Sequence, residues 1–120
     1  MIGTQSAHHP DFIAAANAAK ARIRQLTPGA ARALVETGAV LIDVREKCEY
    51  QQSHLNSAIH ISRGLLEMRI NDIVPDKTTP IICYCTGGNR GAMAADTLQS
   101  LGYKNVFSIE GGMNACTCEE

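Results

Sequence analysis

The sequence predicts an α/β fold, in which a central parallel sheet is covered by helices on both faces. Short apolar runs that favour strands alternate along the chain with segments whose apolar residues recur at helical spacing. The clearest runs, at 39–44 and 81–84, are apolar almost throughout, as strands buried on both faces are. Alternation of strands and helices of this length indicates parallel strands joined by right-handed crossovers.

Length and composition limit the classes of protein that the chain can represent. A chain of 120 residues forms one domain of ordinary size. Its net charge of -1 and its lack of a basic stripe argue against binding to nucleic acid. Insertion into a membrane and secretion are not expected, because Asn17 and Lys20 interrupt the apolar segment 12–19 and no basic region precedes it. We therefore expect a cytoplasmic protein whose five cysteines are reduced.

The first 26 residues are expected to form a lead-in and an amphipathic helix that packs on a domain formed by residues 27–120. The pair His8 and His9 is expected to be exposed, because a metal site needs further ligands. Between residues 11 and 26, apolar side chains recur at steps of four and three: Phe12, Ala16, Ala19, Ile23 and Leu26. This apolar stripe is expected to pack on the chain's own domain, and a dimer contact is the alternative.

The later elements follow from the same patterns. Thr27 and Pro28 are an N-cap and a first-turn residue, and they predict a helix that runs to about residue 37. The next elements are a strand at 39–44, a short helix at 46–53, a strand at 58–61, a short helix at 65–70, a strand at 81–84, a helix at 90–101, a strand at 105–109, and then a glycine loop with a brief tail. Arg45 and Glu49 are spaced to form an ion pair.

A glycine-rich loop joins the strand at 81–84 to the helix that follows it. Cys85 stands at the carboxyl end of that strand, where ligands bind in open α/β sheets. Gly87 and Gly88 allow positive φ, so that successive N–H groups can point at one anion. The N-terminus of the next helix and the charge of Arg90 both favour a thiolate. The stretch is therefore predicted to be a nucleophile in an anion-binding loop.

Six motifs carry a resemblance to a known family. In chain order they are Leu41-Ile42-Asp43-Val44-Arg45-Glu46, Glu49-Tyr50, His54-Leu55, Ala58-Ile59-His60-Ile61, Cys85-Thr86-Gly87-Gly88-Asn89-Arg90 and Glu110-Gly111-Gly112. Their order and spacing, over about residues 25–115, resemble a single-domain rhodanese, a sulfurtransferase. The resemblance implies a three-layer fold with a parallel sheet of about four to five strands.

The resemblance also implies a reaction. Cys85 would take the outer sulfur of thiosulfate or of another persulfide donor, become a persulfide, and pass the sulfur to cyanide or to a thiol, including one on a carrier protein. Arg90 would position the donor anion, because its planar fork suits an oxyanion. The anion would be bound by the loop residues Thr86, Gly87, Gly88, Asn89 and Arg90. No metal and no organic cofactor are expected.

Two other functions remain open at this point. Dual-specificity phosphatases of the cell cycle share the fold, but their loop is one residue longer, whereas only four residues separate Cys85 from Arg90. The shorter loop favours a sulfur-sized target over a phosphoryl group. The other alternative is an interaction module without catalysis, because fold alone does not determine function.

Further residues near the loop receive secondary interpretations. Asp43 and Arg45 end a neighbouring strand and are expected to support the rim of the loop. Cys83 is expected to be a buried structural thiol. Cys116 and Cys118 either relay sulfur from Cys85 or are ordinary thiols of a frayed tail. A metal site made from these four cysteines is not expected, since Cys83 should face the core.

The chain departs from the family pattern at its end. Cys116 occupies the position where the family usually has tryptophan, and the terminal helix of the family is not expected to be completed.

Overall fold

The computed structural model describes residues 8–118. For residues 117 and 118 it describes only the backbone. Its centre is a five-stranded sheet in the order β1-β5-β4-β2-β3, in which every neighbouring pair is parallel. The strands are β1 Arg24–Leu26, β2 Val40–Asp43, β3 Ile59–His60, β4 Ile81–Tyr84 and β5 Val106–Ile109. The helices are α1 Pro10–Arg22, α2 Pro28–Glu36, α3 Lys47–Gln52, α4 Leu66–Ile73 after a 3₁₀ turn at Arg63–Leu65, α5 Asn89–Ser100 and α6 Gly112–Cys118.

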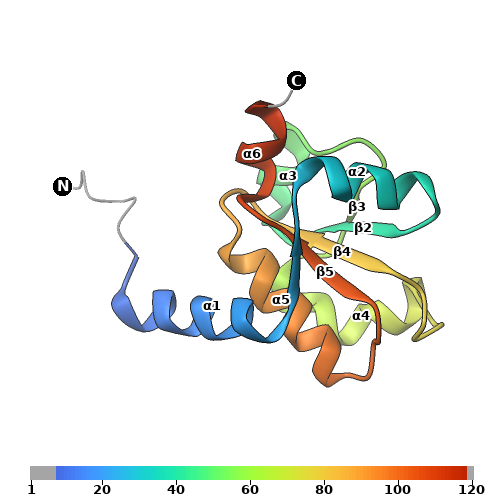
Figure 1. Cartoon of the computed structure of the whole chain (residues 1–120), viewed down its shortest axis with the longest axis horizontal. Helices are drawn as coiled ribbons and strands as arrows, with labels where there is room; N and C mark the ends of the chain where they lie inside the picture. Colours follow the sequence, from blue (N-terminus) through green and yellow to red (C-terminus); the bar gives the residue numbers. More distant parts are fainter. Residues whose placement is uncertain (1–7, 119–120) are drawn as a thin grey trace.

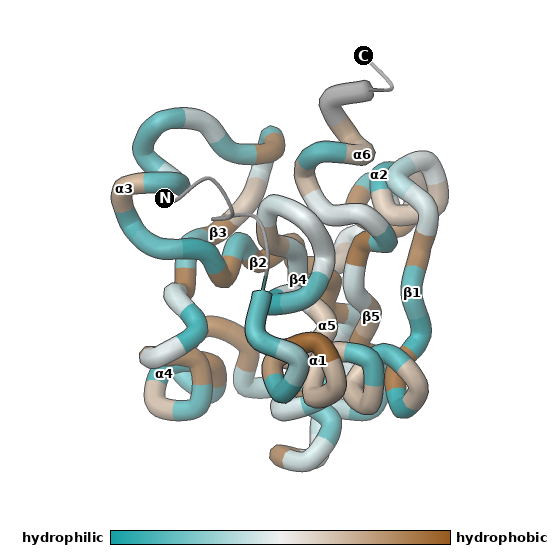
Figure 2. The backbone as a smooth tube through the Cα atoms, turned by 90° about the vertical axis from the view of Figure 1, so that its left-hand side faces the viewer, coloured by the Kyte–Doolittle hydropathy of each residue, from teal (hydrophilic) through white to brown (hydrophobic). Residues whose placement is uncertain are grey.

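Helices cover both faces of the sheet, so the predicted fold class is confirmed. Figure 1 shows α1, α4 and α5 on one side of the sheet and α2, α3 and α6 on the other. Hydropathy separates the centre of the molecule from its periphery, since Figure 2 shows hydrophobic colours in the strands around β2 and β4 and mostly hydrophilic colours in the segment around α3. None of the helices within residues 8–118 combines the length and the apolar character that crossing a membrane requires.

The core consists of one cluster on each face of the sheet, and β4 contributes to both. Ile81 and Cys83 belong to the cluster under α4 and α5, whereas Ile82 and Tyr84 belong to the cluster under α2. All four side chains are fully buried. This is the alternation of a strand whose two faces are both covered. Cys85 continues the same alternation and belongs with Cys83.

The N-terminal helix is shorter than the sequence predicted. It ends at Arg22, and Arg24–Leu26 form the edge strand β1, which pairs with β5. The prediction of helix up to Leu26 was wrong, because residues 24–26 as a strand pair with the edge of β5, which a longer helix would leave unpaired. Ala16 and Ala19 of this helix are buried, and α1 lies against α5.

The C-terminal segment is a helix and not the predicted tail. Gly111 and Gly112 have φ of +77° and +62°, and this sharp turn leads directly into α6. The helix packs on α2, and the side chain of Cys116 is buried in the cluster beneath α2. The prediction of a brief tail in this segment was therefore wrong, because the side chains of Met113 and Cys116 find an apolar surface to cover.

Candidate active site

The loop after β4 folds around the sulfur of Cys85. Gly88 is the N-cap of α5 with φ of +112°, a conformation that favours glycine. Its N–H donates a hydrogen bond to the Sγ atom of Cys85 over 3.1 Å. The thiol is only 2% exposed. The loop thus places a backbone donor and the start of a helix beside the sulfur, and both stabilise negative charge there.

Helix α6 determines how the peptide units of the loop are turned. The N–H of Met113 donates to the carbonyl oxygen of Cys85 over 2.8 Å, and the N–H of Asn114 donates to that of Thr86 over 3.0 Å. In a trans peptide the N–H points opposite to the carbonyl. The N–H groups of Thr86 and Gly87 therefore point away from α6. The first turn of α6 thus fixes the orientation of these peptide units, and the sequence did not predict this contact between α6 and the loop.

Gly112 allows this close contact. A Cβ atom on Gly112 would lie 2.5 Å from the carbonyl oxygen of Cys85 and 2.6 Å from that of Thr86. A Cβ atom does not come this close to a carbonyl oxygen in folded proteins, and the φ angle of Gly112 is also positive. Gly91 is tight in the same way, because a Cβ there would lie 3.0 Å from the Cα of Tyr84. Both glycines let neighbouring backbone reach the loop.

The Gly112→Ala variant is expected to slow, by about tenfold or more, the sulfur transfer that the family resemblance implies, because the added methyl group must push the loop away from α6 and small misplacements at a reacting centre are costly. The measurement is the initial rate with thiosulfate and cyanide. Gly29→Ala is the matched control, since a Cβ at Gly29 meets nothing within 4 Å and alanine favours a helix. Equal rates for the two variants would contradict this role of Gly112.

Arg90 is held by a carboxylate from a different element. Its Nη1 and Nη2 donate to Oε2 and Oε1 of Glu49 over 2.9 and 3.1 Å. The hydroxyl of Thr86 donates to Oε1 of Glu49 over 3.3 Å. The hydrogen bonds from Arg90 lower the pKa of Glu49 to about 2, and Glu49 in turn raises the pKa of Arg90. Both partners are therefore charged at neutral pH.

The predicted pairing of Arg45 with Glu49 is wrong. The guanidinium of Arg45 instead binds both carboxylate oxygens of Asp43, over 2.8 to 3.2 Å, and donates to the carbonyl oxygen of Ser53 over 2.6 Å. Asp43 and Arg45 are 0% and 5% exposed. Their bond ties the end of β2 to Ser53, the residue that follows α3. The contacts of Arg45 thus connect the segment before α3, the helix that contains Glu49, with the residue after it.

One open pocket brings most of the predicted loop residues together. It is lined by His8, Phe12, Glu49, Cys85, Thr86, Gly87, Asn89, Arg90 and Asn114. Five of these residues come from the predicted loop, and the other four come from α3, from α6 and from the N-terminal segment. The sequence did not single out Glu49, Asn114 or Phe12 as site residues. Their spacing along the sequence could not identify these three residues, since each of them reaches the loop only through the tertiary fold.

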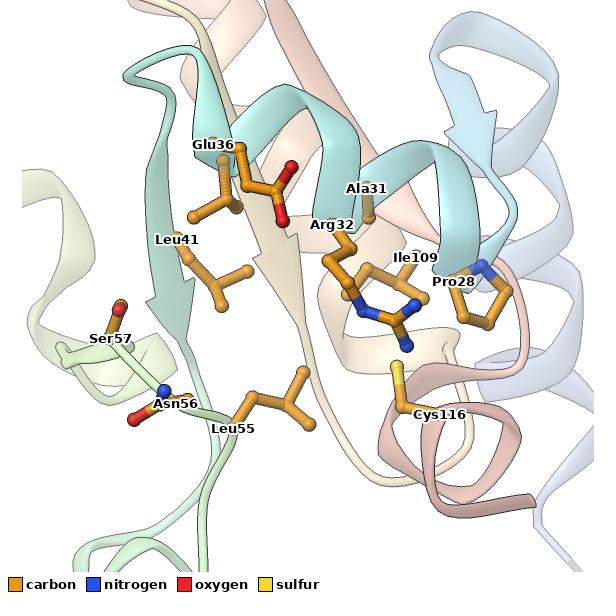
Figure 3. A pocket seen from close by; sticks show the side chains of 11 residues that line it. Pro28, Ala31, Arg32, Glu36, Leu41, Leu55, Asn56, Ser57, Ile109 and Cys116 are labelled. Atoms are coloured by element: carbon orange, nitrogen blue, oxygen red, sulfur yellow. The ribbon is translucent and has the colours of Figure 1, made fainter. Parts of the chain in front are cut away.

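Among the cysteines whose side chains the structure describes, Cys85 alone lines this pocket. Cys83 is fully buried, and its burial raises the pKa of its thiol to about 12. Cys116 lines a second pocket, beside Pro28 and Arg32 of α2 and Ile109 of β5 (Figure 3). Its place under α2 lends no support to a relay of sulfur from Cys85, which belongs to the cluster on the other face. The side chain of Cys118 lies outside the described residues.

A comparison with protein-family models decides the family. The model of the rhodanese-like domain matches residues 27–117. The chain belongs to the rhodanese-like domain family. The match includes β2 to β5 and the whole loop from Cys85 to Arg90, whereas α1 and β1 precede it.

Two curated relatives show the range of proteins that contain this domain. The thiosulfate sulfurtransferase GlpE of Pseudomonas syringae pv. syringae is 33% identical over 89 residues, which are 74% of this chain and 82% of the relative. A tRNA uridine(34) hydroxylase of Erwinia tasmaniensis is 38% identical over 79 residues, but these make up 62% of this chain and only 23% of that protein. The similarity to GlpE extends over most of both chains and confirms an enzyme of the thiosulfate sulfurtransferase type.

Two solved structures also match the N-terminal helix. A protein of unknown function from Rhodopseudomonas palustris, described as a possible tyrosine phosphatase, has a TM-score of 0.83 and 30% identity, and covers 94% of this chain and 93% of its own. The polysulfide-sulfur transferase homodimer of Wolinella succinogenes has a TM-score of 0.77 and 30% identity, and covers 98% of this chain and 90% of its own.

Proposed function

We propose that the protein moves a sulfane sulfur from thiosulfate or another persulfide donor to a thiol or cyanide through a persulfide on Cys85. The observation that carries the proposal is the hydrogen bond that the N–H of Gly88 donates to the Sγ atom of Cys85. It lies in a loop in which only four residues separate Cys85 from Arg90. Similarity to GlpE and to a polysulfide-sulfur transferase supports the same chemistry. The small size of the anion loop favours a sulfur-sized target over a phosphoryl group.

The reaction has two steps with Cys85 as nucleophile and then as leaving group. The thiolate of Cys85 attacks the outer sulfur of thiosulfate, a new S–S bond forms, and the bond between the two sulfur atoms of thiosulfate breaks. Its electron pair leaves with sulfite. The acceptor nucleophile then attacks the outer sulfur of the persulfide, and the electron pair of that S–S bond returns to Cys85 as thiolate. Backbone N–H groups of the loop stabilise the negative charge at each stage.

The remaining loop residues bind and position the donor. The N–H groups of Thr86, Gly87, Gly88 and Asn89 surround the charged sulfur or the departing sulfite, and Arg90 orients the oxyanion end of the donor. Glu49 holds the guanidinium of Arg90 at the rim of the pocket. Asp43 and Arg45 act as support, because their ion pair anchors the helix on which Glu49 stands.

A phosphatase is the second candidate, since the Rhodopseudomonas palustris structure is described as a possible one. The test compares turnover of thiosulfate plus cyanide with turnover of an aryl phosphate by the same preparation. Production of thiocyanate with no release of phosphate is expected. Release of phosphate without thiocyanate would contradict sulfur transfer and favour the phosphatase. Absence of both activities would favour a noncatalytic interaction module.

A further inference from the structure

The helix that precedes the family domain forms part of the pocket around Cys85. The family match begins at residue 27, yet His8 and Phe12 line the same pocket as Cys85 and Arg90. We propose that Phe12 is a specificity-determining residue that contacts the organic group of the sulfur donor and favours donors with an aromatic group. This inference rests on the sulfur transfer proposed above and adds the class of donor that the site prefers.

The packing of α1 explains why Phe12 reaches the pocket. Ala16 and Ala19 are buried at 0% and 2% exposure, and α1 packs against α5. Phe12 lies one turn before Ala16 and therefore on the same face of the helix. Helix α5 begins at Asn89, at the edge of the pocket. A helix that lies along α5 (Figure 1) consequently carries Phe12 to the residues at the start of α5.

The position of α1 on α5 is held by polar contacts as well. Nε and Nη2 of Arg22 donate to the two carboxylate oxygens of Asp96 over 2.9 and 2.7 Å. The side-chain amide of Gln99 donates to the carbonyl oxygen of Arg22 over 3.0 Å. These contacts fasten the end of α1 to the middle and end of α5. The aromatic side chain therefore belongs to a helix anchored on the domain and not to a loose arm.

The pocket has an aromatic wall and a polar wall. Phe12 is half-buried, and its ring lies 4.9 Å from that of His8 at an interplanar angle of 55°. The ion pair of Glu49 and Arg90 and the amide of Asn89 supply the polar wall. The pocket measures about 540 Å³, which is in the range of sites that hold small organic ligands. It therefore suits a donor with a sulfur oxyanion at one end and an aromatic ring at the other.

An aromatic thiosulfonate is the probe with this chemistry. The thiolate of Cys85 attacks its outer sulfur, the Cys85 persulfide forms, and the bond between the two sulfur atoms of the thiosulfonate breaks. The electron pair leaves with the arenesulfinate. Methanethiosulfonate reacts in the same way and carries the same charge, so that a comparison of the two donors isolates the contribution of the ring.

The experiment measures kcat/KM for benzenethiosulfonate and methanethiosulfonate, with cyanide as acceptor, in the native protein and in Phe12→Ala, Phe12→Leu and Ile13→Ala. The native protein is expected to prefer the aromatic donor. Phe12→Ala is expected to lower that preference about three- to tenfold, the usual contribution of a contact between aromatic rings, with little change for the methyl donor. Phe12→Leu should show a preference for the aromatic donor between that of the native protein and that of Phe12→Ala. Ile13, the next residue and 36% exposed, is the matched control and should change neither value.

Two outcomes would overturn the inference while leaving the proposed function in place. One is an unchanged preference in Phe12→Ala, and the other is an equal loss for both donors, which would indicate a purely structural role of Phe12. Failure of the native protein to form a persulfide on Cys85 with either donor would instead overturn the proposed function, and the inference with it.

Discussion

The Cys85→Ser variant is expected to lose sulfur transfer by about a thousandfold or more, the usual consequence of removing a nucleophile. A serine hydroxyl is not ionised at neutral pH and cannot hold the transferred sulfur as a persulfide. The fold should persist, because the serine oxygen can accept the N–H of Gly88 that now contacts the Sγ atom of Cys85. The measurement is the initial rate of thiocyanate formation from thiosulfate and cyanide.

Cys48→Ser is the control for this substitution. Cys48 is an exposed thiol in α3, outside the loop, and its replacement is expected to leave the rate unchanged. Retention of activity in Cys85→Ser together with loss of activity in Cys48→Ser would show that Cys85 is not the nucleophile. Cys83 is a poor substitute nucleophile, because its buried thiol has a pKa raised to about 12.

The Asp43→Ala variant is expected to lower the free energy of unfolding by about 3–5 kcal/mol, because it leaves the guanidinium of Arg45 buried without its counterion. The carboxylate of Asp43 is 0% exposed and accepts hydrogen bonds from both the side chain and the backbone N–H of Arg45. A loss of this size is a large part of the total stability of a typical domain. Urea denaturation followed by circular dichroism measures it.

A more exposed ion pair provides the comparison. Arg22 and Asp96 pair over 2.7 Å, with side chains that are 57% and 25% exposed, and Asp96→Ala should cost only about 0–1 kcal/mol. The double variant Asp43→Ala, Arg45→Met should be more stable than Asp43→Ala alone, since it removes the stranded charge. Similar losses for Asp43→Ala and Asp96→Ala would contradict the assignment of Asp43 and Arg45 as a buried ion pair whose disruption leaves a charge without its partner.

Most strands could be predicted because their apolar character is local. Ile81–Tyr84 is apolar on both sides and lies between helical layers, so that its composition alone indicates a buried strand. Arg24–Leu26 has no such composition, and it forms a strand only because it pairs with Phe107, Ser108 and Ile109. Helix α6 was missed for a similar reason, because the turn at Gly111 and Gly112 is closed by contacts with the distant loop.

The candidate site could be predicted only where it is continuous in the sequence. The residues from Cys85 to Arg90 are adjacent in the chain, and their glycines and charge predict an anion-binding loop directly. Glu49 is 41 residues away from Arg90. The two residues can pair because β2, which precedes α3, and β4, which precedes the loop, are neighbours in the sheet. The role of Phe12 at the pocket depends in turn on the packing of α1 along α5.

Mass spectrometry of the protein after incubation with thiosulfate shows whether Cys85 carries the transferred sulfur. The mass is expected to rise by one sulfur atom, fragmentation should locate that atom on Cys85, and cyanide should remove it. Absence of added sulfur on Cys85, or its location on another cysteine, would contradict a persulfide on Cys85.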